Sequence, residues 1–153
     1  MSIKSHATFK KVFSNISKNI NTKKFLPENT IGEKIKKVRK LHNMDQHKFC
    51  RELKIELTDL YHWEHDLVMP SAKSIKKICD YFKIELSYFD EYYSWYYSNY
   101  EEAFLKWKKD NNYSYSQCAM ILGLHKGSLV NFVHRKYGPS YNFYLLLKDN
   151  HLI

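Results

Sequence analysis

Two histidines, His62 and His65, stand three positions apart in the stretch LTDLYHWEH, which covers residues 57–65. Side chains at that spacing lie on one face of a helix, and imidazoles are common ligands of zinc. A closed zinc site needs four ligands, and no other histidine or cysteine pair in the chain has matching spacing. We therefore predict no metal site and no cofactor. His62 is interpreted as an outward-facing helical residue and His65 as a residue of the following loop.

The residue sets that carry catalysis are not evident in the chain. It contains no glycine-rich phosphate loop and no nucleophile placed beside a base, so we predict that the protein is not an enzyme. No small-molecule ligand is evident either. Cys50, Cys79 and Cys118 are odd in number and far apart, which favours a reducing compartment over a disulfide framework. We interpret the thiols as core residues, with a redox sensor as the alternative.

The formal net charge of +9 favours a polyanionic partner, of which nucleic acid is the commonest. No run of about 18 apolar residues is present, so we predict no membrane span. The start, MSIKSHATFKK, has no continuous apolar segment, which argues against a secretory signal. Residues 1–24 are basic and lack acids, so a mitochondrial-type presequence is the alternative to a cytoplasmic location.

Helical periodicity dominates the chain, and only four Gly and three Pro interrupt it. Residues 7–20 predict an amphipathic helix with a lysine-rich back. Thr30 and Glu33 form a capping box before a helix with the apolar face Ile31, Ile35, Val38 and Leu41. Further helices are predicted at residues 46–53, at residues 57–65 and after Ser71. We therefore expect an all-α fold, beginning with a compact domain of five short helices.

Two of these helices are joined by the three-residue turn Lys54-Ile55-Glu56, which is the helix-turn-helix pattern. Residues 31–89 resemble the λ-repressor/Cro-like (Xre-type) helix-turn-helix family. The residues that carry the resemblance are Gln46, Leu60, Trp63-Glu64 and Pro70-Ser71. The sequence departs from the family at Lys54, where the turn usually has Gly, and at His65-Asp66, where the family usually has Asn-Gly.

The same pattern returns 69 residues further along the chain, where Leu129 aligns with Leu60 and Phe132 with Trp63. Ser114 begins a second capping box, and Gly123 supplies the turn glycine. Residues 99–150 therefore resemble a second, diverged copy of the domain. The predicted organisation is a basic N-terminal arm over 1–29, a first helix-turn-helix domain over 30–86, an aromatic linker helix over 87–98 and a second helix-turn-helix domain over 99–153.

The segment SYFDEYYSWYYSNYEE, residues 87–102, places aromatic residues at helical steps and almost all round the helix axis. A helix of this kind is seldom surrounded by water. We interpret it as a connecting helix clamped between the two domains. The alternatives are a surface for a homodimer or another protein partner, and a platform on which single-stranded bases stack.

The resemblance implies that the third helix of the first domain reads base edges in the DNA major groove. Leu60 and Trp63 point inward, and the outward residues are Leu57, Thr58, Asp59, Tyr61 and His62. By the resemblance, Leu57, Thr58, Asp59 and His62 contact bases, and Gln46 grips the DNA backbone. Thr58 can touch a thymine methyl, whereas Asp59 either accepts a hydrogen bond from cytosine or favours the helix N-terminus.

The second domain has Tyr115 in place of Gln46, which weakens the expectation that it reads DNA. Its corresponding outward residues are Lys126, Gly127, Ser128, Val130 and Asn131, of which Asn131 suits adenine. The predicted phosphate contacts are Lys37, Lys40, Arg135, Lys136 and, on the N-terminal arm, Lys10 and Lys11. A plain solvated face is the alternative for the basic run that contains Lys37, Arg39 and Lys40.

These features predict a sequence-specific regulator of transcription that binds double-stranded DNA in the bacterial cytoplasm, at the nucleoid. The simplest form is a repressor of bacterial, phage or mobile-element type, with two domains that read two half-sites. The alternative is an interaction protein, of antitoxin or anti-repressor type. In that case the first domain binds DNA, and the second domain and the aromatic linker bind a protein partner.

Overall fold

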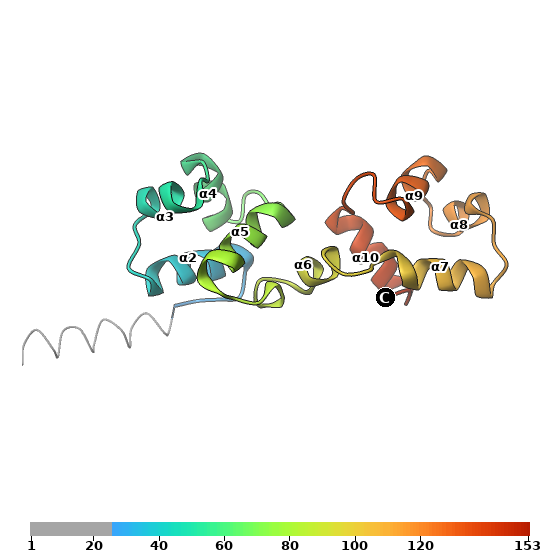
Figure 1. Cartoon of the computed structure of the whole chain (residues 1–153), viewed down its shortest axis with the longest axis horizontal. Helices are drawn as coiled ribbons and strands as arrows, with labels where there is room; N and C mark the ends of the chain where they lie inside the picture. The colour runs from blue at the N-terminus through green and yellow to red at the C-terminus, as the bar shows by residue number, and fades with distance from the viewer. Residues whose placement is uncertain (1–25) are drawn as a thin grey trace, which may run out of the picture. The chain divides into compact units, whose positions relative to one another are not determined.

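The computed structural model describes residues 26–153, and within them every regular element is a helix, as predicted (Figure 1). The predicted helix over residues 7–20, with Lys10 and Lys11, lies outside the described residues. The chain folds as two compact units, which divide between Glu85 and Leu86. We call residues 26–85 the first unit and residues 86–153 the second unit.

Four α-helices form the first unit: α2 (Ile31–Leu41), α3 (Gln46–Leu53), α4 (Leu57–Glu64) and α5 (Ala72–Phe82). Three of them begin where a side chain satisfies free backbone amides. Thr30 and Glu33 form the predicted capping box, and Asp45 and Ser71 cap α3 and α5. Local hydrogen bonding therefore sets these starting points, which is why they were predictable from residue types.

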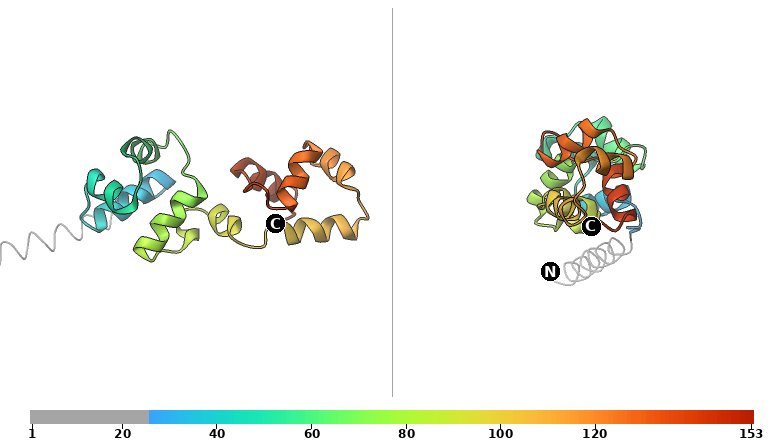
Figure 2. Two further views of the ribbon diagram at one scale, coloured as in Figure 1. Left: turned by 45° about the horizontal axis from the view of Figure 1, so that its top comes forward. Right: turned by 90° about the vertical axis from the view of Figure 1, so that its right-hand side faces the viewer.

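The core of the first unit is apolar and closed to water. Its fully buried side chains come from all four helices, and they are Ile35, Phe49, Leu60, Ile75 and Ile78. Leu41, which was predicted to extend the inward face of α2, is 39% exposed because α2 ends at this residue. The helices α3 and α4 contact each other across the predicted turn, and the turned view of Figure 2 shows them side by side.

The three cysteines are free thiols buried in the two cores, two in the first unit and one in the second. Desolvation raises the pKa of each thiol, that of Cys79 to about 11. A thiol with a raised pKa holds little thiolate at neutral pH and reacts slowly. This favours the core interpretation of the cysteines over the redox-sensor alternative.

The second unit contains a short 3-10 helix, η1 (Leu86–Tyr88), followed by five α-helices. These are α6 (Glu91–Tyr96), α7 (Glu101–Asp110), α8 (Tyr115–Ile121), α9 (Lys126–Val133) and α10 (Tyr141–Asp149). The buried residues of its core include Phe104, Cys118, Leu129, Phe132 and Leu147. As in the first unit, two consecutive helices, here α8 and α9, contact each other across a short turn.

The aromatic segment is not the single helix predicted over residues 87–98. Asp90 breaks it by capping α6, and α6 in turn ends at Tyr96. The Tyr92 hydroxyl donates to the Pro139 carbonyl oxygen at 2.8 Å, and the Trp95 ring lies 5.1 Å from that of Tyr144. These contacts with the segment around α10 outweigh the helical periodicity of the aromatics, so the segment contributes to the core of the second unit.

The internal geometry of the two units repeats with the 69-residue shift seen in the sequence. Residues 57–64 form α4, and residues 126–133 form α9, so these helices have identical lengths and aligned ends. The left-handed backbone positions recur too, at Asn43 and Asn112, at Lys54 and Gly123, and at Asp66 and Arg135. Side-chain caps also recur, at Asp45 and Ser114 and at Ser71 and Ser140.

Lys54 adopts φ 51°, a conformation that costs a residue with a Cβ about 1–2 kcal/mol and glycine almost nothing. We expect Lys54→Gly to stabilise the first unit by about 0.5–1 kcal/mol after the greater freedom of glycine in the unfolded chain is subtracted. Gly123→Lys, at φ 64°, should destabilise the second unit by a similar amount. Hydrogen exchange of α3 and α8 amides measures both effects; faster exchange of α3 in Lys54→Gly would contradict the expectation.

Burial raises the pKa of Tyr92 to about 12, with smaller contributions from Tyr96 and Tyr97. The unfolded chain releases the Tyr92 hydroxyl proton near pH 10. The contribution of neutral Tyr92 to the free energy of unfolding is therefore complete below pH 10 and is lost as the pH rises through 12. Tyr92→Phe should lower stability by about 1 kcal/mol at pH 7 through loss of the hydrogen bond, and should flatten the alkaline decline. Urea unfolding between pH 7 and 12 tests this, with Tyr137→Phe, at an exposed tyrosine, as the control.

Candidate nucleic-acid interface

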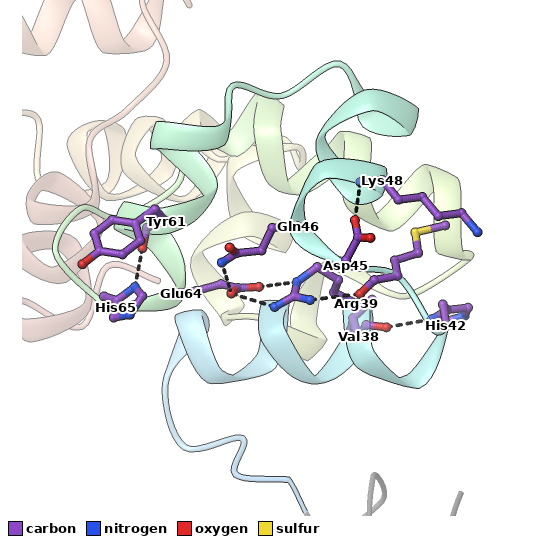
Figure 3. A network of polar contacts seen from close by, with 10 residues as sticks. Val38, Arg39, His42, Asp45, Gln46, Lys48, Tyr61, Glu64 and His65 are labelled. Carbon is purple, nitrogen blue, oxygen red and sulfur yellow. Dashed lines mark hydrogen bonds and ion pairs between the residues drawn. The ribbon is translucent and has the colours of Figure 1, made fainter. Parts of the chain in front are cut away.

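The third helix of the first unit, α4, is held in place by a buried ion pair. Arg39 on α2 donates from Nε to Glu64 Oε1 at 2.6 Å and from Nη2 to Oε2 at 2.9 Å (Figure 3). Two further bonds complete the network, from Arg39 Nη1 to the Met44 carbonyl oxygen and from Gln46 Nε2 to Glu64 Oε2, both 2.9 Å long. The network therefore links four places in the first unit: α2, the turn after it, the start of α3 and the last turn of α4.

Two predictions change because of this network. Arg39 was placed in a basic run on the surface of α2, but it is only 7% exposed, since its partner Glu64 lies on the inner side of α4. Gln46 was predicted to grip the DNA backbone. It is half-buried, and its amide nitrogen is engaged with Glu64, so the side-chain oxygen is the group left for an outside partner.

The structure brings the predicted base-reading residues together on the outer side of α4. Leu57, Thr58, Asp59 and Tyr61 are exposed, and His62 is half-buried. Because Leu60 and Trp63 are anchored in the core and Glu64 in the ion pair, α4 cannot rotate about its axis without breaking these contacts. The helix therefore presents a fixed row of side chains to its surroundings.

His65 does not act with His62 as a pair of ligands. Its Nδ1 lies 2.8 Å from the Tyr61 carbonyl oxygen, and its ring packs on the Tyr61 ring with centroids 4.1 Å apart (Figure 3). Among residues 26–153, no group of three or more His, Cys, Asp or Glu side chains is placed to hold a metal ion. His65 instead restricts the position of the exposed Tyr61 ring.

Three exposed cationic or titratable side chains on α3 were not predicted as contacts: His47, Lys48 and Arg51. They lie on α3, the helix before α4. A DNA phosphate backbone would pass α3 if α4 entered the major groove. Their helical spacing, opposite the buried Phe49, Cys50 and Leu53, was the signal that would have identified them.

The cations predicted on α2 are less available than the sequence suggested. The Lys37 ammonium lies 2.8 Å from Glu28 Oε2, and its side chain is largely buried. Lys40 is half-buried near the end of α2. The pairing of Lys37 neutralises it locally, so α3 offers the more accessible positive charge in the first unit.

The helix α9 of the second unit, which aligns with α4, has a different chemical character. His125 caps it through a 3.1 Å hydrogen bond from the Gly127 amide to Nδ1, and Lys126 and Ser128 are exposed. Val130 and Asn131 are half-buried, as is Gly127. Tyr115, at the position that corresponds to Gln46, is half-buried beneath the Lys108 ammonium, which lies 4.8 Å from the ring centroid.

Arg135, a predicted phosphate contact, is exposed and forms an ion pair within the second unit. Its Nη2 donates to Glu101 Oε2 at 2.6 Å, and its guanidinium lies 4.7 Å from the Tyr100 ring centroid. This hydrogen-bonded pairing lowers the pKa of the Glu101 carboxyl and raises that of Arg135. Lys136, beside it in the same loop, is exposed too.

Comparison with known families agrees with this geometry. Residues 32–102 match a family described as "Helix-turn-helix domain", and the match includes α3, the turn and α4. No curated protein and no solved structure matches the chain. The first part of the chain is therefore a helix-turn-helix domain, the class of fold used to bind DNA. None of the helices described in residues 26–153 is long and apolar enough to cross a membrane.

Arg39→Met should destabilise the first unit by about 3–5 kcal/mol, because it leaves the Glu64 carboxylate buried without its partner. The double variant Arg39→Met/Glu64→Val should recover most of that loss, since it buries no charge; the corresponding position in α9 is Val133. Urea dependence of hydrogen exchange in α2 and α4 measures the difference.

The matched control is Lys106→Met, which breaks the exposed pair with Asp110 and should change stability by less than about 0.5 kcal/mol. A double variant as unstable as Arg39→Met would show that the cost comes from lost packing around Arg39 and not from an unpaired carboxylate.

Proposed function

We propose that the protein is a sequence-specific regulator of transcription that binds double-stranded DNA through α4, most simply a repressor of bacterial, phage or mobile-element type. The observation that carries this is α4 itself, which is anchored from behind by Leu60, Trp63 and Glu64. Its outward residues are Leu57, Thr58, Asp59, Tyr61 and His62. An α-helix fits the major groove, where each base pair presents a distinct pattern. Such a regulator acts in the bacterial cytoplasm, at the nucleoid, and by binding without catalysis.

We further propose that the second unit is a diverged second helix-turn-helix domain, so that one chain contacts two half-sites. The support is the 69-residue shift that relates helix ends, caps and left-handed positions in the two units. Two positions of the polar network also stay in contact. Lys108, Tyr115 and Val133 replace Arg39, Gln46 and Glu64, and Lys108 packs on the Tyr115 ring. Half-sites one helical turn of DNA apart, about 34–36 Å, would suit such a pair.

A second candidate function is favoured by one feature of α8. Met120 is 76% exposed, and Ile121 beside it is also exposed, which is unusual for a helix that would lie along a phosphate backbone. In this case the second unit binds a protein partner, as in an antitoxin or anti-repressor, while α4 binds DNA. The aromatic segment is less suited to that role or to a homodimer contact, because Tyr92 and Tyr93 are buried within the second unit.

Selection of purified full-length protein on a randomised duplex library tests the proposal. The enriched sequence is then measured by fluorescence anisotropy at several salt concentrations. We expect a two-part motif in which Thr58→Ala/His62→Ala relaxes one half and Asn131→Ala relaxes the other. Asn142→Ala, at an exposed position on α10, is the control and should leave both halves unchanged.

Three other results are informative. A single half-motif lost only in the first variant would assign the second unit to a protein partner. Binding that shows no motif and falls with salt, by a slope of roughly −0.9 per phosphate contacted, would describe a non-specific binder and overturn the proposal. The absence of duplex binding would overturn it as well.

A further inference from the structure

The outer side of α4 lacks the side chains that usually read bases through paired hydrogen bonds. Between Leu57 and Glu64 there is no Arg, Lys, Asn or Gln. Arg and Lys are the usual partners of guanine, and Asn and Gln those of adenine. The nearest amide, that of Gln46, already donates to Glu64. A protein that reads DNA with this helix must therefore draw much of its discrimination from another kind of contact.

Exposed apolar groups occupy the positions where those side chains would stand. Leu57 is 39% exposed and Tyr61 49% exposed, and Thr58 adds an exposed methyl group between them along the helix. Beyond the end of α4, Leu67 and Val68 are more exposed still. The major groove offers one apolar feature for such groups to contact, the C5 methyl of thymine.

We infer that α4 reads thymine methyl groups, so that the half-site of the first unit is rich in A·T pairs whose thymines lie beneath Leu57, Thr58 and Tyr61. This inference rests on the proposed function. Burying a methyl group against an apolar side chain removes both from water, which favours thymine over cytosine or uracil at the same position.

Two features of the first unit make this kind of reading effective. The Tyr61 ring is restrained by the His65 ring 4.1 Å away, so less side-chain freedom is lost when it meets a base. The Asp59 side chain is exposed and makes no hydrogen bond or ion pair with the residues described in the range 26–153. Its carboxylate can accept from the exocyclic amino group of a base beside the methyl contacts, adenine N6 as well as the cytosine N4 named above.

Charge on the neighbouring helix offsets the acids of α4. Glu56 and Asp59 are exposed acids that would repel phosphates. Lys48 and Arg51 are exposed on α3, which a phosphate backbone would pass. The acids and cations therefore fit one arrangement, in which α3 grips the backbone and α4 meets the bases.

The test replaces thymine by deoxyuridine, which removes the methyl group and keeps every hydrogen-bonding group. The probe is the duplex enriched by selection with the full chain, with each thymine of the first half-site replaced in turn. Each contacted methyl should contribute about fourfold in Kd, or about 0.8 kcal/mol. In Leu57→Ala, the penalty should disappear at the thymine beneath Leu57 and persist at the other positions.

Leu41→Ala is the matched control, because Leu41 is the same residue type with the same 39% exposure but lies at the end of α2. It should keep the full deoxyuridine penalty. If a duplex with a defined motif binds equally well with thymine and deoxyuridine, the inference is overturned and the proposed function stands. If selection yields no motif, both fail. A Leu57→Ala protein that binds every duplex like the wild type but sediments at a different mass would assign the apolar face of α4 to protein contact and overturn the inference.

Discussion

The buried Arg39–Glu64 pair is the constraint on which the first unit depends. Charges are costly to bury, and a pair of them is tolerated only when nearly every donor and acceptor is satisfied. Here Met44 and Gln46 supply the remaining partners, each at 2.9 Å, so the pair has one favourable arrangement. Hydrogen bonds are directional in a way that apolar contacts are not. The pair therefore fixes how α4 is turned relative to α2 and α3, and with it which residues face outward.

The second unit has helices at the corresponding positions, but Lys108 and Val133 stand where the first unit has Arg39 and Glu64. Val133 has no charge to orient, and Lys108 over the Tyr115 ring is a contact that tolerates small rotations of the partners. The position of α9 consequently depends on apolar packing, chiefly through Leu129 and Phe132, which constrains volume more than direction. On physical grounds α4 is the more firmly oriented of the two helices, while α9, with Lys126 and Asn131, has the side chains more suited to polar contact.

The parts of the fold that were predictable from sequence are those determined by neighbouring residues. The capping box of Thr30 and Glu33 and the turn at Lys54 involve residues within a few positions, so residue types alone reveal them. The burial of Arg39 was not predictable from its basic surroundings, because its partner Glu64 is 25 positions away. The same reason explains the pairing of Arg135 with Glu101 and the break in the aromatic segment, where Tyr92 reaches Pro139. On α4, periodicity identified the outward residues. Their apolar character points to a mode of binding only when the structure shows that the Gln46 amide already donates to Glu64.

The net charge of +9 is therefore a poor guide to where a polyanion would bind. Arg39 is paired with Glu64, Lys37 with Glu28 and Arg135 with Glu101, so part of the formal positive charge is already neutralised within the protein. The helix α4 carries acids and apolar groups, and exposed cations lie on several other elements, among them α3, α9 and the loop at Lys136. In the proposed function, gripping the backbone and reading the bases therefore fall to different helices. In such a protein, salt weakens the grip of α3 and α9 far more than the apolar contacts of α4, because screening acts on charges and leaves apolar burial almost untouched.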